Sequence, residues 1–123
     1  MAVARGQPGD WYSAVWVVRP DSSAILRVTR LSDDPTSIGG GIADTRDAGR
    51  RGCDRPAISI AVDSVTGFVH LAYFLEPKEG AGVWLTHSMD RGATWHPSVP
   101  VAFGADPAAA QVAARHDTVA VAF

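Results

Sequence analysis

The chain has 123 residues, of which 46% are hydrophobic and 20% are charged, and its formal net charge is -2. This composition is typical of a folded globular domain and excludes an intrinsically disordered chain. The near-neutral charge gives no basic surface for nucleic acid, and no apolar stretch is long enough to span a membrane.

The beginning of the chain does not resemble a secretory signal. Arg5 and Asp10 interrupt the region that such a signal needs to be continuously apolar, and no long apolar run follows them. We therefore expect any signal to lie upstream of this chain.

Six short segments rich in Val, Ile, Thr and aromatic residues predict β-strands, and the Gly, Pro, Asp and Ser between them predict turns. Several of these segments, such as residues 69–75, are apolar on both faces. That pattern is typical of strands in a sheet that is covered on both sides. The predicted strands are residues 10–18, 25–31, 57–62, 68–75, 82–87 and 99–103.

Two further segments need separate interpretation. Residues 107–115 are rich in alanine and could form about two helical turns. We favour an extended segment there, because the residues around it repeat a strand pattern found earlier in the chain. Residues 39–41 are three consecutive glycines. We interpret them as a flexible turn, since a phosphate-binding loop would need a following lysine and a strand-to-helix setting.

A repeated pattern runs through the chain. Three segments, residues 10–16, 67–73 and 117–123, consist of small and β-branched residues that end in an aromatic residue. They recur roughly every 50 residues, which suits a four-stranded blade of a β-propeller.

This repeat predicts an all-β fold of propeller blades, each a four-stranded antiparallel meander. Residues 1–52 and 53–104 would form two blades, and residues 105–123 would begin a third. Because a propeller closes with about four to eight blades, we expect the chain to be a partial propeller domain.

One motif points to a family. Ser88, Asp90, Gly92, Thr94 and Trp95 have the spacing Ser-x-Asp-x-Gly-x-Thr-Trp between two predicted strands. The segment resembles the Asp box, or BNR repeat, of sialidase-like β-propellers. The resemblance implies a propeller fold and, in the parent protein, a glycoside hydrolase or a related non-catalytic propeller.

The wider pattern of that family is also present. Arg55-Pro56 opens an inner strand, and Asp63 and Gly67 stand at a predicted hairpin. The resemblance covers residues 53–104 well and residues 1–52 loosely. In the first blade, residues 32–35 hold only a remnant of the box, without its glycine and tryptophan.

The box residues have a physical role in a turn. Asp90 can accept hydrogen bonds from backbone amides, Gly92 can adopt a positive φ, and the Trp95 ring can be buried. We predict a structural role for them, which is also the role that the resemblance implies. The alternative is that Asp90 is a catalytic acid.

Substrate contacts are expected at the opposite end of the blade from the box. Connections in a meander alternate between the two ends, so the loop at 76–81 and the segment at 44–55 share that end. The resemblance implies that arginines there hold a carboxylate, which matches the guanidinium fork. Arg55 is the candidate substrate-binding residue, although it lacks the Ile of the family's Arg-Ile-Pro pattern, and an ion pair with Asp54 or Asp47 on the surface is the alternative.

Arg50 and Arg51 are further binding candidates, with solvated loop charges as the alternative. Glu76 is the catalytic candidate, because it stands where the resemblance places an acidic aspartate. A nucleophilic tyrosine is not identified, since Tyr12 and Tyr73 fall within predicted strands and are interpreted as core aromatics. The residues of this chain therefore do not compose a complete active site.

No metal or cofactor is predicted. The four histidines His70, His87, His96 and His116 do not pair at the spacing of metal ligands. The single cysteine, Cys53, cannot form an internal disulfide, and we expect it to be a small buried or half-buried side chain.

Two functions remain open from the sequence. The parent protein could be a sialidase-type glycosidase that cleaves terminal acidic sugars, or a non-catalytic module that binds or scaffolds a glycan or protein. The isolated chain is expected to be inactive. Open blade edges would also favour self-association, and the resemblance implies relatives that are often secreted or on the cell surface.

Overall fold

The computed structural model describes residues 2–6, 9–33, 38–116 and 118–123, and all regular secondary structure in these ranges is β. No helix in these ranges could cross a membrane. The first four-stranded sheet, sheet A, contains β1 (Ala2–Arg5), β2 (Asp10–Val18), β3 (Ala24–Ser32) and β4 (Gly39–Asp44). The second, sheet B, contains β5 (Ser59–Val62), β6 (Val69–Leu75), β7 (Gly82–Ser88) and β8 (Val99–Phe103). A separate hairpin contains β9 (Gln111–Arg115) and β10 (Thr118–Ala122).

Each four-stranded sheet is an antiparallel meander whose strands follow chain order. The predicted all-β class and the four-stranded antiparallel sheets are therefore confirmed. The alanine-rich segment forms β9 rather than a helix, as the favoured interpretation held. The predicted hairpin after β5 is also present, where the Gly67 amide donates to the Asp63 carbonyl at 2.8 Å.

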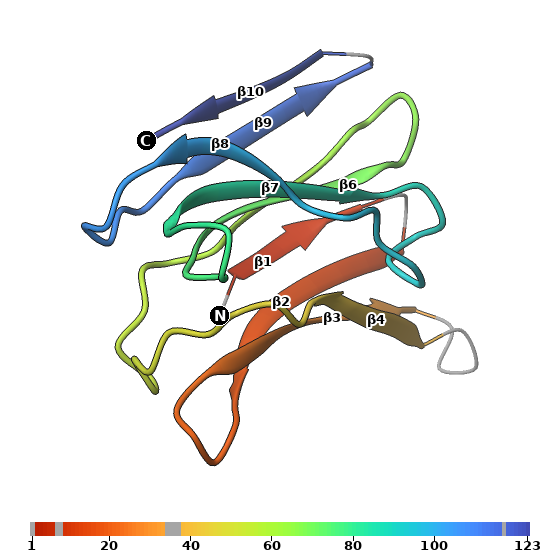
Figure 1. Ribbon diagram of the computed structural model, residues 1–123. Helices are drawn as coiled ribbons and strands as arrows, with labels where there is room; N and C mark the ends of the chain where they lie inside the picture. Colours follow the sequence, from red (N-terminus) through yellow and green to blue (C-terminus); the bar gives the residue numbers. More distant parts are fainter. Residues whose placement is uncertain (1, 7–8, 34–37, 117) are drawn as a thin grey trace.

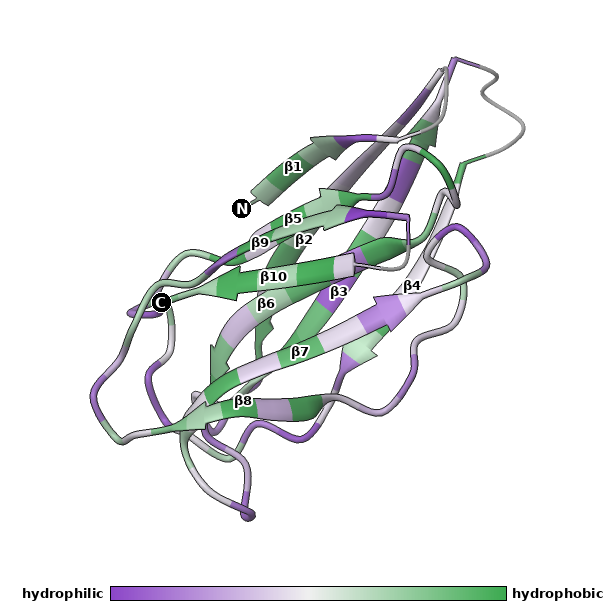
Figure 2. Ribbon diagram, turned by 90° about the horizontal axis from the view of Figure 1, so that it is seen from above, coloured by the Kyte–Doolittle hydropathy of each residue, from purple (hydrophilic) through white to green (hydrophobic). Residues whose placement is uncertain are grey.

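Sheet B lies between sheet A and the β9–β10 hairpin (Figures 1 and 2). Every residue of β6 is buried, because one face of the strand packs on sheet A while the other is turned toward the hairpin. This layering explains why β6 is apolar on both faces. The larger core lies between sheets A and B and is built from Tyr12, Ala14, Leu26, Val28, Ala43, Ile58, Val69, Leu71, Tyr73, Leu75 and Trp84. The smaller core, between sheet B and the hairpin, contains Ala72, Val83, Ala110 and Val112.

The first strands of the three layers are neighbours. Strand β1 packs beside β5, and β5 packs beside β9. The Val112 amide on β9 donates a hydrogen bond of 3.0 Å to the Ser59 hydroxyl on β5. The second strand of sheet B, β6, also packs beside β9.

The glycine run at 39–41 belongs to strand β4, so its interpretation as a flexible turn is wrong. The reason lies in its neighbours rather than in its own composition. A Cβ on Gly41 would come within 2.4 Å of the Ala93 carbonyl, and Gly40 has a φ of 138° with its Cβ position 2.2 Å from the Val28 carbonyl. Glycine is therefore required at position 41 because the loop at 89–98 approaches β4 directly, and at position 40 because of its positive φ and its close contact with β3 of the same sheet.

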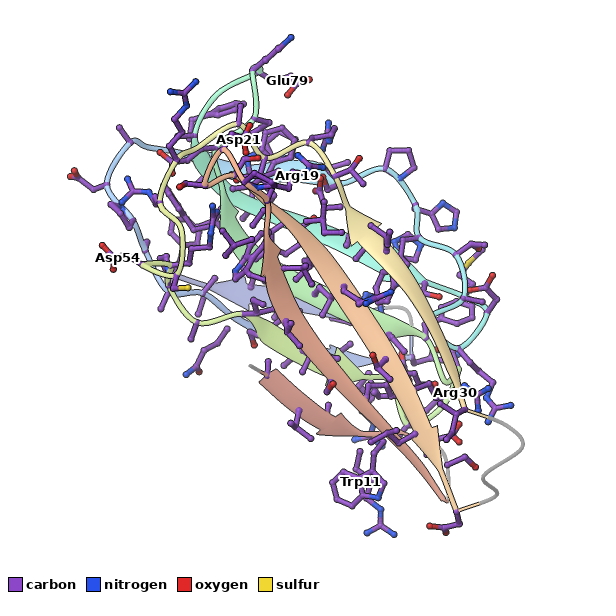
Figure 3. The ribbon with its side chains drawn as sticks, turned by 90° about the horizontal axis from the view of Figure 1, so that it is seen from below. Trp11, Arg19, Asp21, Arg30, Asp54 and Glu79 are labelled. Carbon is purple, nitrogen blue, oxygen red and sulfur yellow. The ribbon has the colours of Figure 1, made fainter. Side chains whose placement is uncertain are left out.

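The connections gather at two opposite ends of the strands. Figure 3 shows Arg19, Asp21, Asp54 and Glu79 at one end, and Trp11 and Arg30 toward the other. The first of these ends carries the segments at 45–58 and 76–81, and we call it the charged end. The other carries the loop at 89–98, which contains most of the Asp-box-like motif. The remnant at 32–35 lies partly outside the described residues, because positions 34 and 35 are not among them.

Candidate functional site

The two segments expected to hold a substrate do meet at the charged end. The Ala48 amide donates to the Glu76 carbonyl at 2.9 Å, which joins the segment entering sheet B to the loop between β6 and β7. The predicted site residues Arg51, Arg55 and Glu76 all lie around this junction. Arg50 lies in the same segment and is exposed.

Arg55 is locked into the junction rather than presented to solvent. Its Nη2 lies 3.1 Å from Asp47 Oδ2, and the two side chains are only 4% and 1% exposed. It also donates to the carbonyls of Gly52 at 2.8 Å and Ser22 at 3.0 Å, and its guanidinium lies 5.2 Å from the centre of the Trp16 ring. The alternative pairing with Asp47 is therefore the one that forms, although it is buried and not on the surface.

Asp47 has a role in joining the two sheets that was not predicted from the sequence. Its carboxylate accepts hydrogen bonds from the Ala24 amide at 3.0 Å and the Glu76 amide at 3.4 Å. These amides belong to sheet A and to the loop after β6 of sheet B. One buried carboxylate thus joins both sheets and neutralises Arg55, as a buried charge requires. An Asp in a charged loop carries no sequence signal for this role.

Glu76 pairs with Arg51. The Arg51 Nε donates to Glu76 Oε1 and its Nη2 donates to Oε2 at 3.4 Å, so the guanidinium engages both carboxylate oxygens. The Arg51 guanidinium also lies 5.5 Å from the centre of the Phe74 ring. Hydrogen bonding to Glu76 raises the pKa of Arg51. The interpretation of Arg51 as a solvated charge is therefore wrong, and Glu76 is engaged by a neighbour instead of facing an open site.

A groove opens beside this junction with a volume of about 220 Å³. Cys53 stands exposed beside it, which contradicts the expected burial of this residue. The indole of Trp16 and the side chain of Arg55 give the groove one aromatic and one cationic wall element. It is lined by Val15, Trp16, Val18, Cys53, Arg55, Pro56, Ala57 and Ile58.

A tyrosine–carboxylate pair exists, but it is buried between the sheets. The Tyr73 hydroxyl donates to Asp44 Oδ2 at 2.7 Å, and the Ser98 hydroxyl donates to the same oxygen at 2.8 Å. Burial, and then the charge of Asp44, raises the pKa of Tyr73, so the phenol remains protonated. Tyr73 is 0% exposed and Tyr12 is 1% exposed, which confirms both as core aromatics.

The residues of the Asp-box-like segment, 88–95, form a closed set of hydrogen bonds. The Ser88 hydroxyl donates to Asp90 Oδ1 at 2.7 Å and accepts from the Gly92 amide at 2.8 Å. The Thr94 amide donates to Asp90 Oδ1 at 2.9 Å, and its hydroxyl donates to Oδ2. Gly92 has a φ of 83°, and the Trp95 indole donates to the Gly92 carbonyl at 3.0 Å. Each residue of the motif thus has a function in the turn.

These hydrogen bonds set the ionisation of Asp90. The Thr94 hydroxyl and amide, followed by the Ser88 hydroxyl, lower the pKa of Asp90 to about 2. Such a carboxyl carries no proton to donate near neutral pH, which argues against the alternative of a catalytic acid.

The 88–95 loop also clamps sheet A. Arg91 donates to Asp10 Oδ2 through Nε at 3.0 Å and Nη2 at 2.6 Å, and the Asp10 side chain is only 2% exposed. A Cβ at Gly92 would lie 3.5 Å from the Tyr12 ring and 3.7 Å from Val28, so this part of the loop lies directly against sheet A. Sequence reasoning missed this contact, because Arg91 and Asp10 lie far apart in the chain and neither has a motif of its own.

Three histidines stack on the side of sheet B that is turned toward the β9–β10 hairpin. The ring centres of His70 and His87 are 5.7 Å apart, and those of His87 and His96 are 4.3 Å apart. Burial lowers the pKa of His70 and of His87, and each also feels its neighbouring imidazole. The rings lie face to face, and within the described ranges no three His, Cys, Asp or Glu side chains are grouped to hold a metal ion.

The chain matches no protein-family model, no curated protein and no solved structure. The chemistry of the site must therefore be judged from its own geometry. The charged end has a groove lined in part by Trp16, and its candidate residues Arg55, Arg51 and Glu76 are held in ion pairs.

Proposed function

We propose that this chain is part of a sialidase-like Asp-box β-propeller that serves as a non-catalytic recognition or scaffolding module for a glycan or a protein. In this proposal sheet A, sheet B and the β9–β10 hairpin are successive blades. The observation that carries the proposal is the arrangement of first strands, because β1 packs beside β5 and β5 packs beside β9, as expected of the first strands of successive blades. The hydrogen-bonded turn at 88–95 supports the same family.

The non-catalytic part rests on the charged end. The Arg55 guanidinium is paired with Asp47 and donates hydrogen bonds to two backbone carbonyls. Both carboxylate oxygens of Glu76 accept hydrogen bonds from Arg51. A glycosidase of this type needs an acid beside a nucleophile, both facing the sugar. The groove beside Trp16 instead suits binding, because an aromatic face packs well on an apolar sugar or peptide surface.

The second candidate is a sialidase-type hydrolase in a longer parent protein, with the remaining groups on other blades. It is favoured by one observation, namely that Arg55 and Glu76 share one end and one hydrogen-bonded junction with Asp47. In that case the ion pairs would have to exchange for substrate contacts.

Two assays separate the candidates. A fluorogenic sialoside offered to the parent protein between pH 4 and 8 should give no turnover, and turnover that is lost in Glu76→Gln would contradict the recognition proposal. On a glycan and peptide array the protein should bind, and a bulky maleimide on Cys53 should abolish that binding. Cys53→Ser, treated with the same reagent, is the matched control and should bind as before. Binding that survives the labelling would place the ligand elsewhere.

A further inference from the structure

The row of three stacked histidines is fixed by the backbone of sheet B. His70 on β6 and His87 on β7 are directly opposite each other in the strand register. The His96 amide donates to the His87 carbonyl at 3.0 Å, which brings the third ring over the second. Strand pairing therefore holds the three imidazoles together as neighbours.

The row runs from solvent into the packed interior. His96 is exposed, His87 is half-buried and His70 is only 7% exposed. Along β6, His70 alternates with Ala72, and across the sheet it is paired with Ala61 of β5. Both alanines pack in the core between sheet B and the β9–β10 hairpin. His70 thus lies on the side of the sheet that the hairpin covers.

Strand β9 is the part of the hairpin that packs on β6. Figure 1 shows the hairpin on the side of sheet B that faces away from sheet A, and the view of Figure 2 shows it lying over β6. A charge on His70 can therefore become fully hydrated only if the hairpin moves.

The described residues of the hairpin provide no acidic partner for a protonated His70. The side chains that it packs against sheet B are all apolar, namely Ala108, Ala110, Val112 and Val121. Its charged or titratable side chains, Arg115 and His116, are exposed. Asp117, in the turn of the hairpin, lies outside the described residues.

Asp63, which follows β5, is the acidic group whose charge acts on His70. Its Oδ1 accepts hydrogen bonds from the amides of Val65 at 2.8 Å and Thr66 at 3.2 Å, so this carboxylate is engaged by its own turn. Burial, and then the charge of His87, lower the pKa of His70 against the attraction of Asp63. The folded protein therefore favours the neutral form of His70.

The same kinds of cause act on His87. Burial, and then the charge of His96, lower the pKa of His87. A histidine whose pKa is lowered by folding stabilises the folded state while it is neutral. For both residues this contribution is complete above the ordinary value of 6.5 and is lost as the pH falls through the lowered value.

We propose that His70, His87 and His96 form an acid-sensitive joint, which holds the β9–β10 hairpin on sheet B near neutral pH and loosens it when the imidazoles are protonated. Histidine is the side chain whose charge ordinarily changes between pH 5 and 8. Stacked imidazolium rings repel each other, and the rings nearer solvent can turn toward water, whereas the ring of His70 is covered. The contact above His70 is therefore the one that opens. This inference does not depend on the proposed propeller or on its function.

Hydrogen exchange of the Val112 amide measures the joint, because this amide donates across the two layers to the Ser59 hydroxyl. In the intact chain its protection factor, corrected for the intrinsic effect of pH on exchange, should fall about tenfold or more between pH 7.5 and pH 5. The Leu71 amide is the internal reference, since β6 is paired with a strand on each side, and it should keep its protection.

Two variants identify the group that titrates. His70→Gln keeps a polar side chain without a titrating ring, and it should abolish the loss of protection at Val112. His116→Asn is the matched control, because it removes an exposed histidine of the hairpin that is outside the row, and asparagine tolerates the φ of 57° at this position. This variant should lose protection as the wild type does.

A titration of the imidazole proton signals gives a second readout that leaves position 70 unchanged. His87→Gln removes the like charge beside His70 and should raise the pKa of His70, although the burial of the ring remains. A pKa that does not respond to this substitution would show that the rings are not coupled, and the proposal would be wrong.

Three exchange results would also overturn the proposal. The protection factor of Val112 could be the same at both pH values, or it could fall equally in His70→Gln. The Leu71 amide could also lose protection in step with Val112, which would mean that acid unfolds sheet B as a whole instead of opening one contact.

Discussion

Three aspartates of this chain organise backbone amides. Asp63 accepts from the Val65 amide at 2.8 Å, Asp90 from the Thr94 amide at 2.9 Å, and Asp47 from the Ala24 amide at 3.0 Å. Each carboxylate satisfies donors that would otherwise lack partners at a turn or strand end. At the scale of single residues, each of these three aspartates therefore has a structural role, because it holds the backbone of a turn or a strand end in place.

Asp90→Ala should lower the free energy of unfolding by roughly 1–3 kcal/mol, because the donors of the turn lose their acceptor. Chemical denaturation of both proteins at neutral pH measures the difference. Asp106→Ala, which changes an exposed aspartate outside this turn, is the control. An unchanged unfolding midpoint in Asp90→Ala would contradict the account of the turn.

The same carboxylate predicts a pH dependence. The pKa of Asp90 is lowered from 3.8 to about 2, so the ionised form stabilises the folded state. Its contribution is complete above about pH 4 and is lost as the pH falls toward 2. The stability difference between the wild type and Asp90→Asn should shrink over that range. A difference that stays constant from pH 5 to 2 would exclude the mechanism.

Cys53 is free and exposed, so it should react with a thiol reagent in the folded protein. Labelling followed by absorbance should reach one equivalent in native buffer, at a rate within about tenfold of the rate in denaturant. A thiol that reacts only after denaturation would show that Cys53 is buried in the folded protein, which would contradict its exposure in the structure.

At the scale of elements, the loop at 88–95 joins the sheets. Arg91 reaches Asp10, Gly92 packs on Tyr12, and the Ala93 carbonyl lies over Gly41. The loop thus fixes its own hairpin and at the same time contacts the neighbouring sheet, which explains the glycine at position 41 of β4.

Gly41→Ala should destabilise the protein by roughly 1–3 kcal/mol, because its Cβ would come within 2.4 Å of the Ala93 carbonyl. Thermal unfolding measures the change. The control is Gly104→Ala, where no atom lies within 4 Å of the added Cβ, and that variant should keep the wild-type melting temperature. Equal melting temperatures for both variants would show that β4 does not lie against the loop.

Strands with clear periodicity were predictable, and residues whose role depends on another sheet were not. The prediction for residues 10–18 agrees with β2, and that for 99–103 agrees with β8, because β-branched and aromatic residues dominate them. Strand β1 was not predicted, since four residues carry too little pattern, and β4 was misread because glycine normally signals a turn.

The candidate site shows the same division. Arg55 and Glu76 were correctly predicted to lie at one end of the sheet, because the connections of a meander alternate between its two ends. It did not reveal that Asp47 would neutralise Arg55 or that Arg51 would occupy Glu76. Those pairings depend on how loops of two sheets pack, and charged loop residues have no periodicity from which to infer it.

At the scale of the whole molecule, sheet A has one uncovered face. Val3, Trp11 and Leu31 are 54%, 45% and 48% exposed, and Trp11 stands between the buried residues Asp10 and Tyr12. Figure 3 shows Trp11 standing away from the sheet, and the Arg5 guanidinium lies 5.7 Å from its ring centre. An apolar face of this kind favours association, and in the proposed propeller a neighbouring blade would cover it.

We therefore expect the isolated chain to self-associate, and Trp11→Lys to weaken that association. Static light scattering over a range of concentrations gives the mass. Val65→Lys is the matched control, because Val65 is 58% exposed but lies in the turn between β5 and β6. A wild-type mass that does not rise with concentration, or an equal loss in Val65→Lys, would contradict this role of the face.

The account depends most on layers that meet along their first strands, and nuclear Overhauser spectroscopy tests this directly. The Val112 amide should show a cross-peak to the Ser59 side chain, because the two atoms are 3.0 Å apart although they belong to different layers. The pairing of Ser59 with Ala72 within sheet B provides the internal control. If the control cross-peaks appear and those between Ser59 and Val112 do not, the layers do not share this line and the propeller proposal falls.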